Sequence, residues 1–187
     1  MDTKQKPAIC VFCGSSYGDD PAFRDAARAI GTGIAKAGWS VVFGGGGNGL
    51  MGDVARSAQA GGATVQGIIP AFLQLLEPPI SAEERLIVTP HIQERKALML
   101  QMSDAFVVLP GGLGTFDEFF EVAVEAQLGV HDKPIVVVNV NGYYDALDAM
   151  LHATVKAGFA REKTLKLYDL ADGPQDALKI LEGRLNA

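Results

Sequence analysis

The sequence predicts an α/β fold, a doubly wound parallel sheet with helices on both faces. Short apolar runs alternate with amphipathic stretches along all 187 residues, and this alternation is typical of a parallel sheet. Several runs, among them 41–43, 106–109 and 135–138, are apolar at every position, as expected for strands buried on both faces. No internal repeat, linker or low-complexity tract interrupts the pattern, so we expect a single domain over residues 1–187.

The expected elements follow one another in a regular order. Strands are expected at 8–16, 39–47, 63–70, 105–112 and 133–140, with a short one at 165–170. Helices are expected at 21–37, 50–60, 94–102, 116–128 and 143–158, with a last one that begins near Pro174. The first helix has the clearest signal, because its apolar residues recur at helical spacing. From Ala71 to about Pro90 we expect irregular structure, since Pro78 and Pro79 forbid a helix there.

Composition disfavours several classes of function. The net charge of −6 argues against a general nucleic-acid binder, because such proteins neutralise phosphates with basic surfaces. No apolar run approaches the roughly 20 residues that span a bilayer, and the N-terminal sequence lacks a secretory pattern. We therefore expect a cytoplasmic protein without nucleic-acid or membrane partners.

The two cysteines, Cys10 and Cys13, form a C-x-x-C pair. This spacing can mark a redox pair or half of a zinc site. The pair lies inside an expected strand, however, where residues three apart point to opposite faces. There is no second cysteine pair and the three histidines are scattered, so we interpret both cysteines as structural thiols and expect no metal.

Ligands of doubly wound sheets bind beyond the carboxyl ends of the strands, and three expected loops there are rich in small residues: CGSS at 13–16, GGGGNG at 44–49 and PGGLGT at 110–115. Glycine lets backbone N–H groups approach phosphate oxygens closely. In the first loop, Gly14, Ser15 and Ser16 either donate to a phosphate or cap the next helix. The second loop fits neither the dinucleotide fingerprint nor the P-loop. We predict a phosphate or ribose cradle that includes Gly45 and Gly46, with a tight turn as the alternative.

The strongest feature is PGGLGTFDE at 110–118. Thr115 is expected to be a helix N-cap, and Thr115 with Glu118 matches a capping box, in which Glu118 folds back on Thr115. Capping alone does not require the three glycines before it. The preceding helix begins with Arg95 and Lys96, two cations that oppose its dipole. They either hold a phosphate or orient a carboxylate, or they are solvated surface residues.

These residues resemble the LOG ("Lonely Guy") family of cytokinin riboside 5′-monophosphate phosphoribohydrolases. PGGLGTFDE fits the family signature P-G-G-x-G-T-x-x-E, ERKALM at 94–99 resembles its Arg-Lys helix, and the resemblance covers nearly the whole chain. It implies a Rossmann-like nucleotide-binding hydrolase that cleaves the N-glycosidic bond of a nucleoside 5′-monophosphate. The products would be the free base and ribose 5-phosphate. The resemblance also implies a homodimer, and we expect no cofactor.

By motif position, Arg95 and Glu118 match the family's catalytic pair. The nucleotide-binding positions are matched by Arg95, Lys96, Gly111, Gly112, Leu113, Gly114, Thr115, Phe116 and Asp117. Glu118 is expected to stabilise a sugar cation and to activate water. Glu121 either contacts ribose or lies on the surface, and we favour the surface.

Two departures from the family pattern concern the base. Val124 and Glu125 replace a Thr-Trp pair, and Ile92 and Gln93 stand where Met-His is frequent. The alternative function is a binding protein that carries a nucleotide or the molybdenum cofactor on the same glycine cradle. A third possibility is a nucleotide sensor without turnover.

Overall fold

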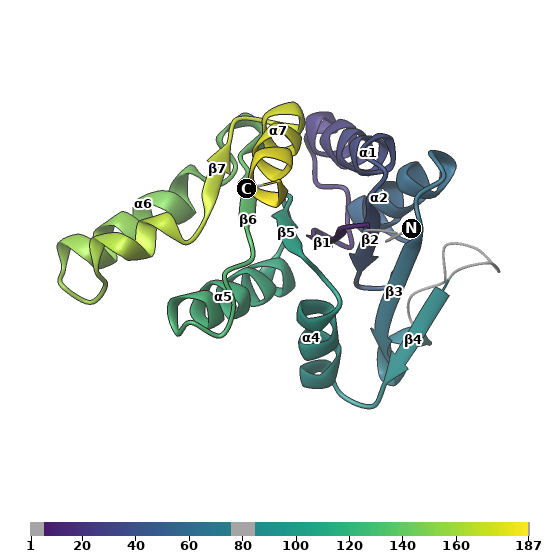
Figure 1. Cartoon of the computed structure of the whole chain (residues 1–187), viewed down its shortest axis with the longest axis horizontal. Coiled ribbons are helices and arrows are strands. Elements are labelled where there is room, and N and C mark those ends of the chain that lie inside the picture. Colours follow the sequence, from purple (N-terminus) through teal and green to yellow (C-terminus); the bar gives the residue numbers. More distant parts are fainter. Residues whose placement is uncertain (1–5, 76–84, 187) are drawn as a thin grey trace.

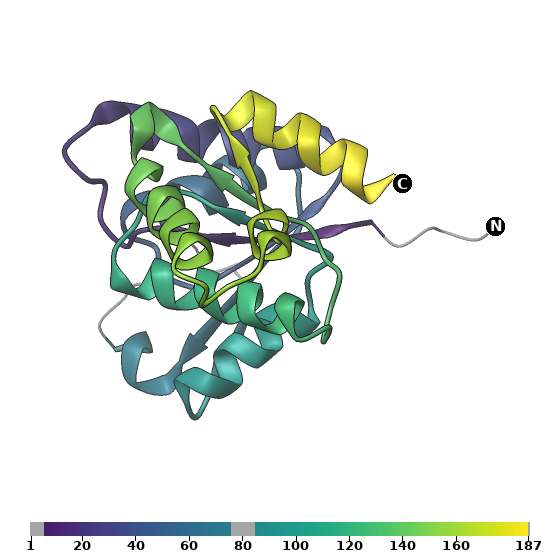
Figure 2. The ribbon, with the colours of Figure 1, turned by 90° about the vertical axis from the view of Figure 1, so that its left-hand side faces the viewer.

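The computed structural model describes residues 6–75 and 85–186. Its centre is one seven-stranded sheet with the strand order β4-β3-β2-β1-β5-β6-β7, and every neighbouring pair is parallel (Figure 1). Helices α1, α2 and α7 pack on one face, and α4 and α5 on the other (Figures 1 and 2). The prediction of a doubly wound α/β fold is confirmed.

The strands are β1 (Ala8–Phe12), β2 (Ser40–Phe43), β3 (Val65–Pro70), β4 (Arg85–Thr89), β5 (Ala105–Val108), β6 (Ile135–Val138) and β7 (Asp169–Ala171). The α-helices are α1 (Pro21–Lys36), α2 (Gly49–Ala60), α3 (Ala71–Gln74), α4 (Ile92–Gln101), α5 (Leu113–Gln127), α6 (Asp145–Lys156) and α7 (Pro174–Leu185). The 3-10 helices of the described residues are η1 (Val140–Gly142) and η2 (Glu162–Lys166).

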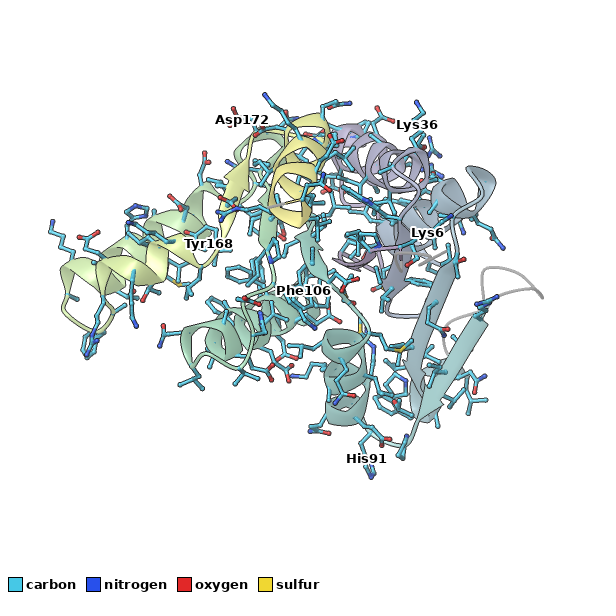
Figure 3. The ribbon with its side chains drawn as sticks, viewed as in Figure 1. Lys6, Lys36, His91, Phe106, Tyr168 and Asp172 are labelled. Atoms are coloured by element: carbon cyan, nitrogen blue, oxygen red, sulfur yellow. The ribbon has the colours of Figure 1, made fainter. Side chains whose placement is uncertain are left out.

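The sheet separates two apolar cores. Cys13 lies in the core shared with α1, α2 and α7, whereas Cys10 lies in the core shared with α4 and α5. Figure 3 shows Phe106 of this second core between β5 and α5. Both cysteines are free and buried, and burial raises the pKa of each thiol. The prediction that the two side chains point to opposite faces of the sheet is confirmed.

Two predictions about elements were wrong. The segment expected to be irregular contains the short helix α3 and the edge strand β4, which pairs with β3 from Gln66–Arg85 to Pro70–Thr89. The prolines argue against a helix but not against a strand, and Leu86, Ile87 and Val88 form an apolar run within β4. The strand expected at 165–170 is found only at its end, because η2 runs to Lys166 and β7 begins at Asp169. The Pro78-Pro79 pair lies outside the described residues.

The chain order places a switch point between β1 and β5. The chain runs outward from β1 to β4 at one edge, then returns through α4 to β5 on the other side of β1. Connections leave β1 and β5 in opposite directions, and such a crevice at the carboxyl ends of the strands is where doubly wound folds bind ligands. Figure 2 shows β1 running from the N-terminal end of the chain toward the side of the sheet where the strands end.

Candidate active site

The three glycine loops meet at this switch point. The N–H of Gly14 donates to the carbonyl of Pro110 at 3.0 Å, which joins the first loop to the third. The N–H of Leu50 donates to the carbonyl of Gly14 at 3.1 Å, which joins the first loop to the second. Gly49 has a positive φ of 59° and packs directly on the backbone of Ser15, a position that favours glycine.

The second loop is packed inside the protein rather than open to solvent. Gly45 and Gly46 are both buried, and Gly45 faces Ile69 and Leu86. The first free N–H groups of α2, those of Leu50 and Met51, donate to the carbonyl of Gly14. The amide of Gly14 is also occupied, whereas Ser15 is exposed.

The third loop presents the open helix terminus. α5 begins at Leu113 with Gly112 as its N-cap, so the prediction that Thr115 is the N-cap was wrong. The N–H groups of Thr115 and Phe116 donate to the carbonyl of Gly112. Gly112, Leu113 and Gly114 are exposed, and the first N–H groups of a helix attract anions.

Glu118 and Arg95 form a buried ion pair. Nη2 of Arg95 lies 3.0 Å from Oε1 of Glu118, and both side chains are about nine-tenths buried. Nε of Arg95 donates to the carbonyl of Ile68 in β3 at 3.1 Å. Glu118 therefore points toward α4 and does not fold back on Thr115, so the capping-box interpretation was wrong.

Burial raises the pKa of Glu118 to about 7, although the charge of Arg95 and its hydrogen bond lower it. Taking a carboxylate out of water disfavours its charged form, and here this cost exceeds the attraction of the guanidinium. A carboxyl group that titrates near neutral pH can accept or release a proton under physiological conditions. Buried carboxylates with such a pKa are concentrated at functional sites.

Lys96 is held by two carboxylates of α5. Its Nζ lies 3.0 Å from Asp117 and 2.6 Å from Glu121. Burial would lower the pKa of Lys96, but the two carboxylates raise it overall. Glu121 is 30% exposed, so it is an ion-pair partner and more than the surface residue that the sequence favoured.

A cavity of about 240 Å³ lies beside the first and third loops. Its walls include Gly14, Ser16, Tyr17, Phe23, Gly111 and Tyr143. The hydroxyl of Tyr143 donates to the carbonyl of Gly111 at 2.5 Å, and the ring of Tyr143 meets that of Phe23 edge to face at 5.3 Å. The sequence did not predict these aromatic walls, because Tyr143 lies far along the chain from Tyr17 and Phe23.

The residues that depart from the family pattern divide between two places. Glu125 lines a small cavity together with Glu118, Lys96 and Glu121. Val124 is on the outer side of α5, where it lines an apolar groove with Phe159. Ile92 begins α4, and Gln93 beside it is exposed.

Within residues 6–75 and 85–186, no group of three or more His, Cys, Asp or Glu side chains is arranged to hold a metal ion. Figure 3 shows His91 projecting away from the molecule at the turn before α4. In the same described part of the chain, no helix is both long and apolar enough to cross a membrane.

The fold and the site together define a Rossmann-like α/β protein whose switch-point crevice joins an open helix N-terminus to a buried Arg–Glu pair. Residues 51–181 match the family model described as "possible lysine decarboxylase". The probable cytokinin riboside 5′-monophosphate phosphoribohydrolase LOGL2 of Oryza sativa subsp. japonica is 40% identical over 174 residues, covering 93% of this chain and 71% of that protein. LOG1 of Arabidopsis thaliana, a cytokinin riboside 5′-monophosphate phosphoribohydrolase, is 39% identical over 93% of this chain and 82% of its own. The chain belongs to the LOG family.

Solved structures show the same fold. The molybdenum cofactor binding protein of Rippkaea orientalis has a TM-score of 0.75 at 22% identity, covering 98% of this chain and 99% of that one. The molybdenum cofactor carrier protein of Chlamydomonas reinhardtii has a TM-score of 0.74 at 24% identity, covering 98% and 100%. At this level of identity the likeness concerns the fold alone.

Proposed function

We propose that this chain is a hydrolase that cleaves the N-glycosidic bond of adenosine 5′-monophosphates, including N6-substituted ones. The products are the free base and ribose 5-phosphate. The observation that carries the proposal is the buried pair of Arg95 and Glu118, 3.0 Å apart, at the switch-point crevice. Both residues stand at the positions that match the catalytic pair of the LOG signature.

The reaction needs a carboxylate next to the sugar. As the bond from C1′ to the base nitrogen breaks, its electron pair leaves with the base, and positive charge builds on C1′ and the ring oxygen. The ionised Glu118 stabilises this charge and takes a proton from the attacking water, whose oxygen bonds to C1′. The departing base takes up one proton from solvent and Glu118 releases to solvent the one it accepted, so the net reaction adds one water across the bond.

Arg95 keeps Glu118 in place and favours its ionised form. The guanidinium is fixed at both ends, by the carbonyl of Ile68 and by the carboxylate of Glu118. A planar, doubly anchored guanidinium leaves the carboxylate little freedom to rotate. Without Arg95, the cost of burying a charge at Glu118 would raise its pKa further.

The phosphate end of the substrate is assigned to the start of α5. The N–H groups of Leu113 and Gly114 open this helix, and its dipole favours an anion there. Glu118 is the fifth residue after Leu113 in the helix, a rise of about 7.5 Å. This spacing is comparable to the span of a ribose 5-phosphate, so one substrate can reach both points.

The other predicted binding residues mainly hold the helices and loops of the site in position. Lys96 and Asp117 fix α4 to α5 through their ion pair, and Thr115 packs beneath Gly111. Phe116 packs edge to face on Tyr144 at 6.0 Å. Ser15 is exposed at the crevice, whereas Gly14, Gly45 and Gly46 shape the loops around it.

We propose a homodimer that uses the groove between α5 and α6. This groove has a volume of about 250 Å³ and is lined by Phe120, Val124, Leu151 and Phe159 among others. Phe159 is 91% exposed and Val124 is 49% exposed, and large apolar side chains in one patch are typical of interfaces. A second copy of the chain is the occupant that the family resemblance implies. Sedimentation of Phe159→Asp should show monomers if this is correct, and an unchanged dimer would contradict it.

The proposed location is the cytoplasm, without nucleic-acid or membrane partners. Both cysteines are free thiols, as is usual in reducing compartments. Cell fractionation with an antibody against the chain tests the location.

Base release tests the proposed activity directly. Glu118→Ala and Arg95→Ala should each abolish release of adenine from AMP, while circular dichroism shows an intact fold. Glu182→Gln in α7, an exposed carboxylate of the same type, serves as the control and should keep full activity. Full activity in either site variant would refute the assignment.

The alternative is a non-catalytic carrier of a nucleotide or of the molybdenum cofactor. It is supported by the likeness of fold to carrier proteins. A carrier, however, does not require the buried pair of Arg95 and Glu118. A panel of nucleoside monophosphates separates the two proposals, because a carrier or sensor would bind without releasing base.

A further inference from the structure

Among the residues that the structure describes, the catalytic side of the crevice has no excess of positive charge. Its two cations, Arg95 and Lys96, face three carboxylates, those of Asp117, Glu118 and Glu121. Even with Glu118 protonated, the charges only balance. The 5′-phosphate of a nucleotide carries up to two negative charges at neutral pH, so its counter-charge must come from elsewhere.

An excess of positive charge lies across the same loops. We call it the arginine cluster: Arg24 and Arg28 of α1 and Arg56 of α2, gathered around Asp53 of α2. The three guanidinium groups lie 2.7, 2.9 and 2.8 Å from the Asp53 carboxylate. Asp53 is 4% exposed, and the cluster holds three positive charges against one negative charge.

The geometry leaves donors of the cluster facing outward. Arg24 and Arg28 bind Asp53 through Nε, and within the described residues no hydrogen bond is formed by their terminal nitrogens. The two side chains are 43% and 49% exposed. A carboxylate that fixes the inner edge of a guanidinium leaves its terminal N–H groups oriented for an oxyanion.

Two contacts connect the cluster to the glycine loops. Nη1 of Arg56 donates to the carbonyl of Gly47 at 2.9 Å. The guanidinium of Arg24 lies 4.3 Å from the ring centre of Tyr17, and Tyr17 lines the cavity beside Gly111. Two further carboxylates offset part of the cluster's charge. Asp20 accepts from the N–H of Ala22 and from Asn141 and stays ionised, because these bonds lower its pKa, and the charge of Asp25 acts on Arg24.

We propose that the arginine cluster supplies the positive potential that attracts and holds the substrate's phosphate, with Arg24 as the member closest to the phosphate. The phosphate then occupies the cavity between Tyr17 and Gly111, at the start of α5. This inference rests on the proposed function and deepens it, because it gives the substrate a direction: phosphate toward α1, glycosidic bond toward Glu118.

A purely structural role explains less of the arrangement. If the role were only to hold α1 against α2, one arginine of α1 paired with Asp53 would be enough. The second and third arginines add repulsion among themselves, which Asp53 and the nearby Asp25 relieve only in part. The chain as a whole carries a charge of −6, so an anionic substrate needs a local positive field to approach.

Calorimetric binding to the inactive Glu118→Gln protein tests the proposal with AMP and adenosine as probes. Arg24→Gln and Arg28→Gln should each weaken AMP binding about fivefold or more at low salt, with less effect at high salt where charges are screened. Neither change should alter adenosine binding. Arg24→Lys keeps the charge and should keep most of the AMP affinity.

Arg184→Gln is the matched control. Arg184 is also an exposed arginine paired with an aspartate, Asp169. However, α7 ends on the side of the sheet where β1 begins, away from the glycine loops at the carboxyl ends of the strands (Figure 2). An equal loss of AMP affinity in Arg184→Gln, an equal loss for adenosine, or no loss in Arg24→Gln would each overturn the proposal. If the native protein releases no base from any monophosphate, the proposed activity fails, whereas this binding experiment still decides where a phosphate sits.

Discussion

The guanidinium of Arg95 lies against Gly44, in the space that a side chain at position 44 would occupy. A Cβ at position 44 would overlap Nη2 of Arg95, the nitrogen that faces Glu118. The sulfur of Met51 closes the same space at 3.2 Å from such a Cβ. The first glycine of the 44–49 loop therefore makes room for the arginine, a role that the phosphate-cradle prediction did not include.

Gly44→Ala should lower kcat for base release by about 100-fold or more, because a displacement of roughly 1 Å at a catalytic group has such effects. The loss should act through Arg95, so Gly44→Ala combined with Arg95→Ala should be no worse than Arg95→Ala alone. Kinetics of the two single variants and the double variant measure this. Gly183→Ala in α7, where an added Cβ meets open space, is the control. Additive losses would show that Gly44 acts elsewhere.

The rate of base release should rise with pH through about 7 and then level off, because Glu118 must be ionised to act and its pKa is raised to about 7. The charge of Asp117 raises this pKa and that of Lys96 lowers it. Asp117→Asn should therefore move the acidic limb of kcat to lower pH, and Lys96→Gln to higher pH. Shifts in the same direction for both variants would contradict this account.

Glu118 should also make stability depend on pH. Its pKa is higher in the folded state, about 7, than its ordinary value of 4.5, so the folded state holds this proton more tightly. The resulting stabilisation is complete below pH 4.5 and is lost as pH rises to about 7, by on the order of 3 kcal/mol. Denaturant unfolding at pH 5 and pH 8 should show this loss in the native protein. Glu118→Gln should lack it, and an identical pH dependence would argue against a buried, titrating Glu118.

Asp53→Asn should lower the free energy of unfolding by about 2 kcal/mol, because it leaves three arginines around a neutral amide. We take a value below the full cost of breaking a buried pair, since the arginines are nearly half exposed. Asp169→Asn, which breaks a more exposed pair with Arg184, should cost less than about 1 kcal/mol. Equal losses in the two variants would contradict the special position of Asp53.

The sequence predicted the fold well wherever burial was complete. Strands such as β5 and β6 are buried at every residue, and their uniform apolar runs made them visible. β4 was missed although Leu86, Ile87 and Val88 are apolar, because the prolines before it were taken to mark irregular structure as far as Pro90, whereas they argue only against a helix. The extent of the single domain, residues 1–187, stays a prediction.

The sequence predicted the pairing of Arg95 with Glu118 only through the family motif. Local rules favoured a capping box, because Thr115 and Glu118 have the right spacing. The helix begins at Leu113 instead, with Gly112 as its cap, so Glu118 lies beyond the first turn and is free to meet α4. The arginine cluster had no local signal either, since its members come together only when α1 packs on α2.

The opposite orientation of Cys10 and Cys13 provides two independent reporters. Each thiol is sealed in a different core, so a variant that keeps only one cysteine reacts with a thiol reagent only when that side of the sheet opens. Cys10 would report on the layer that carries Arg95 and Glu118, and Cys13 on the layer that carries the arginine cluster. Labelling rates measured with and without nucleotide would show how much binding reduces the opening of each layer of the molecule.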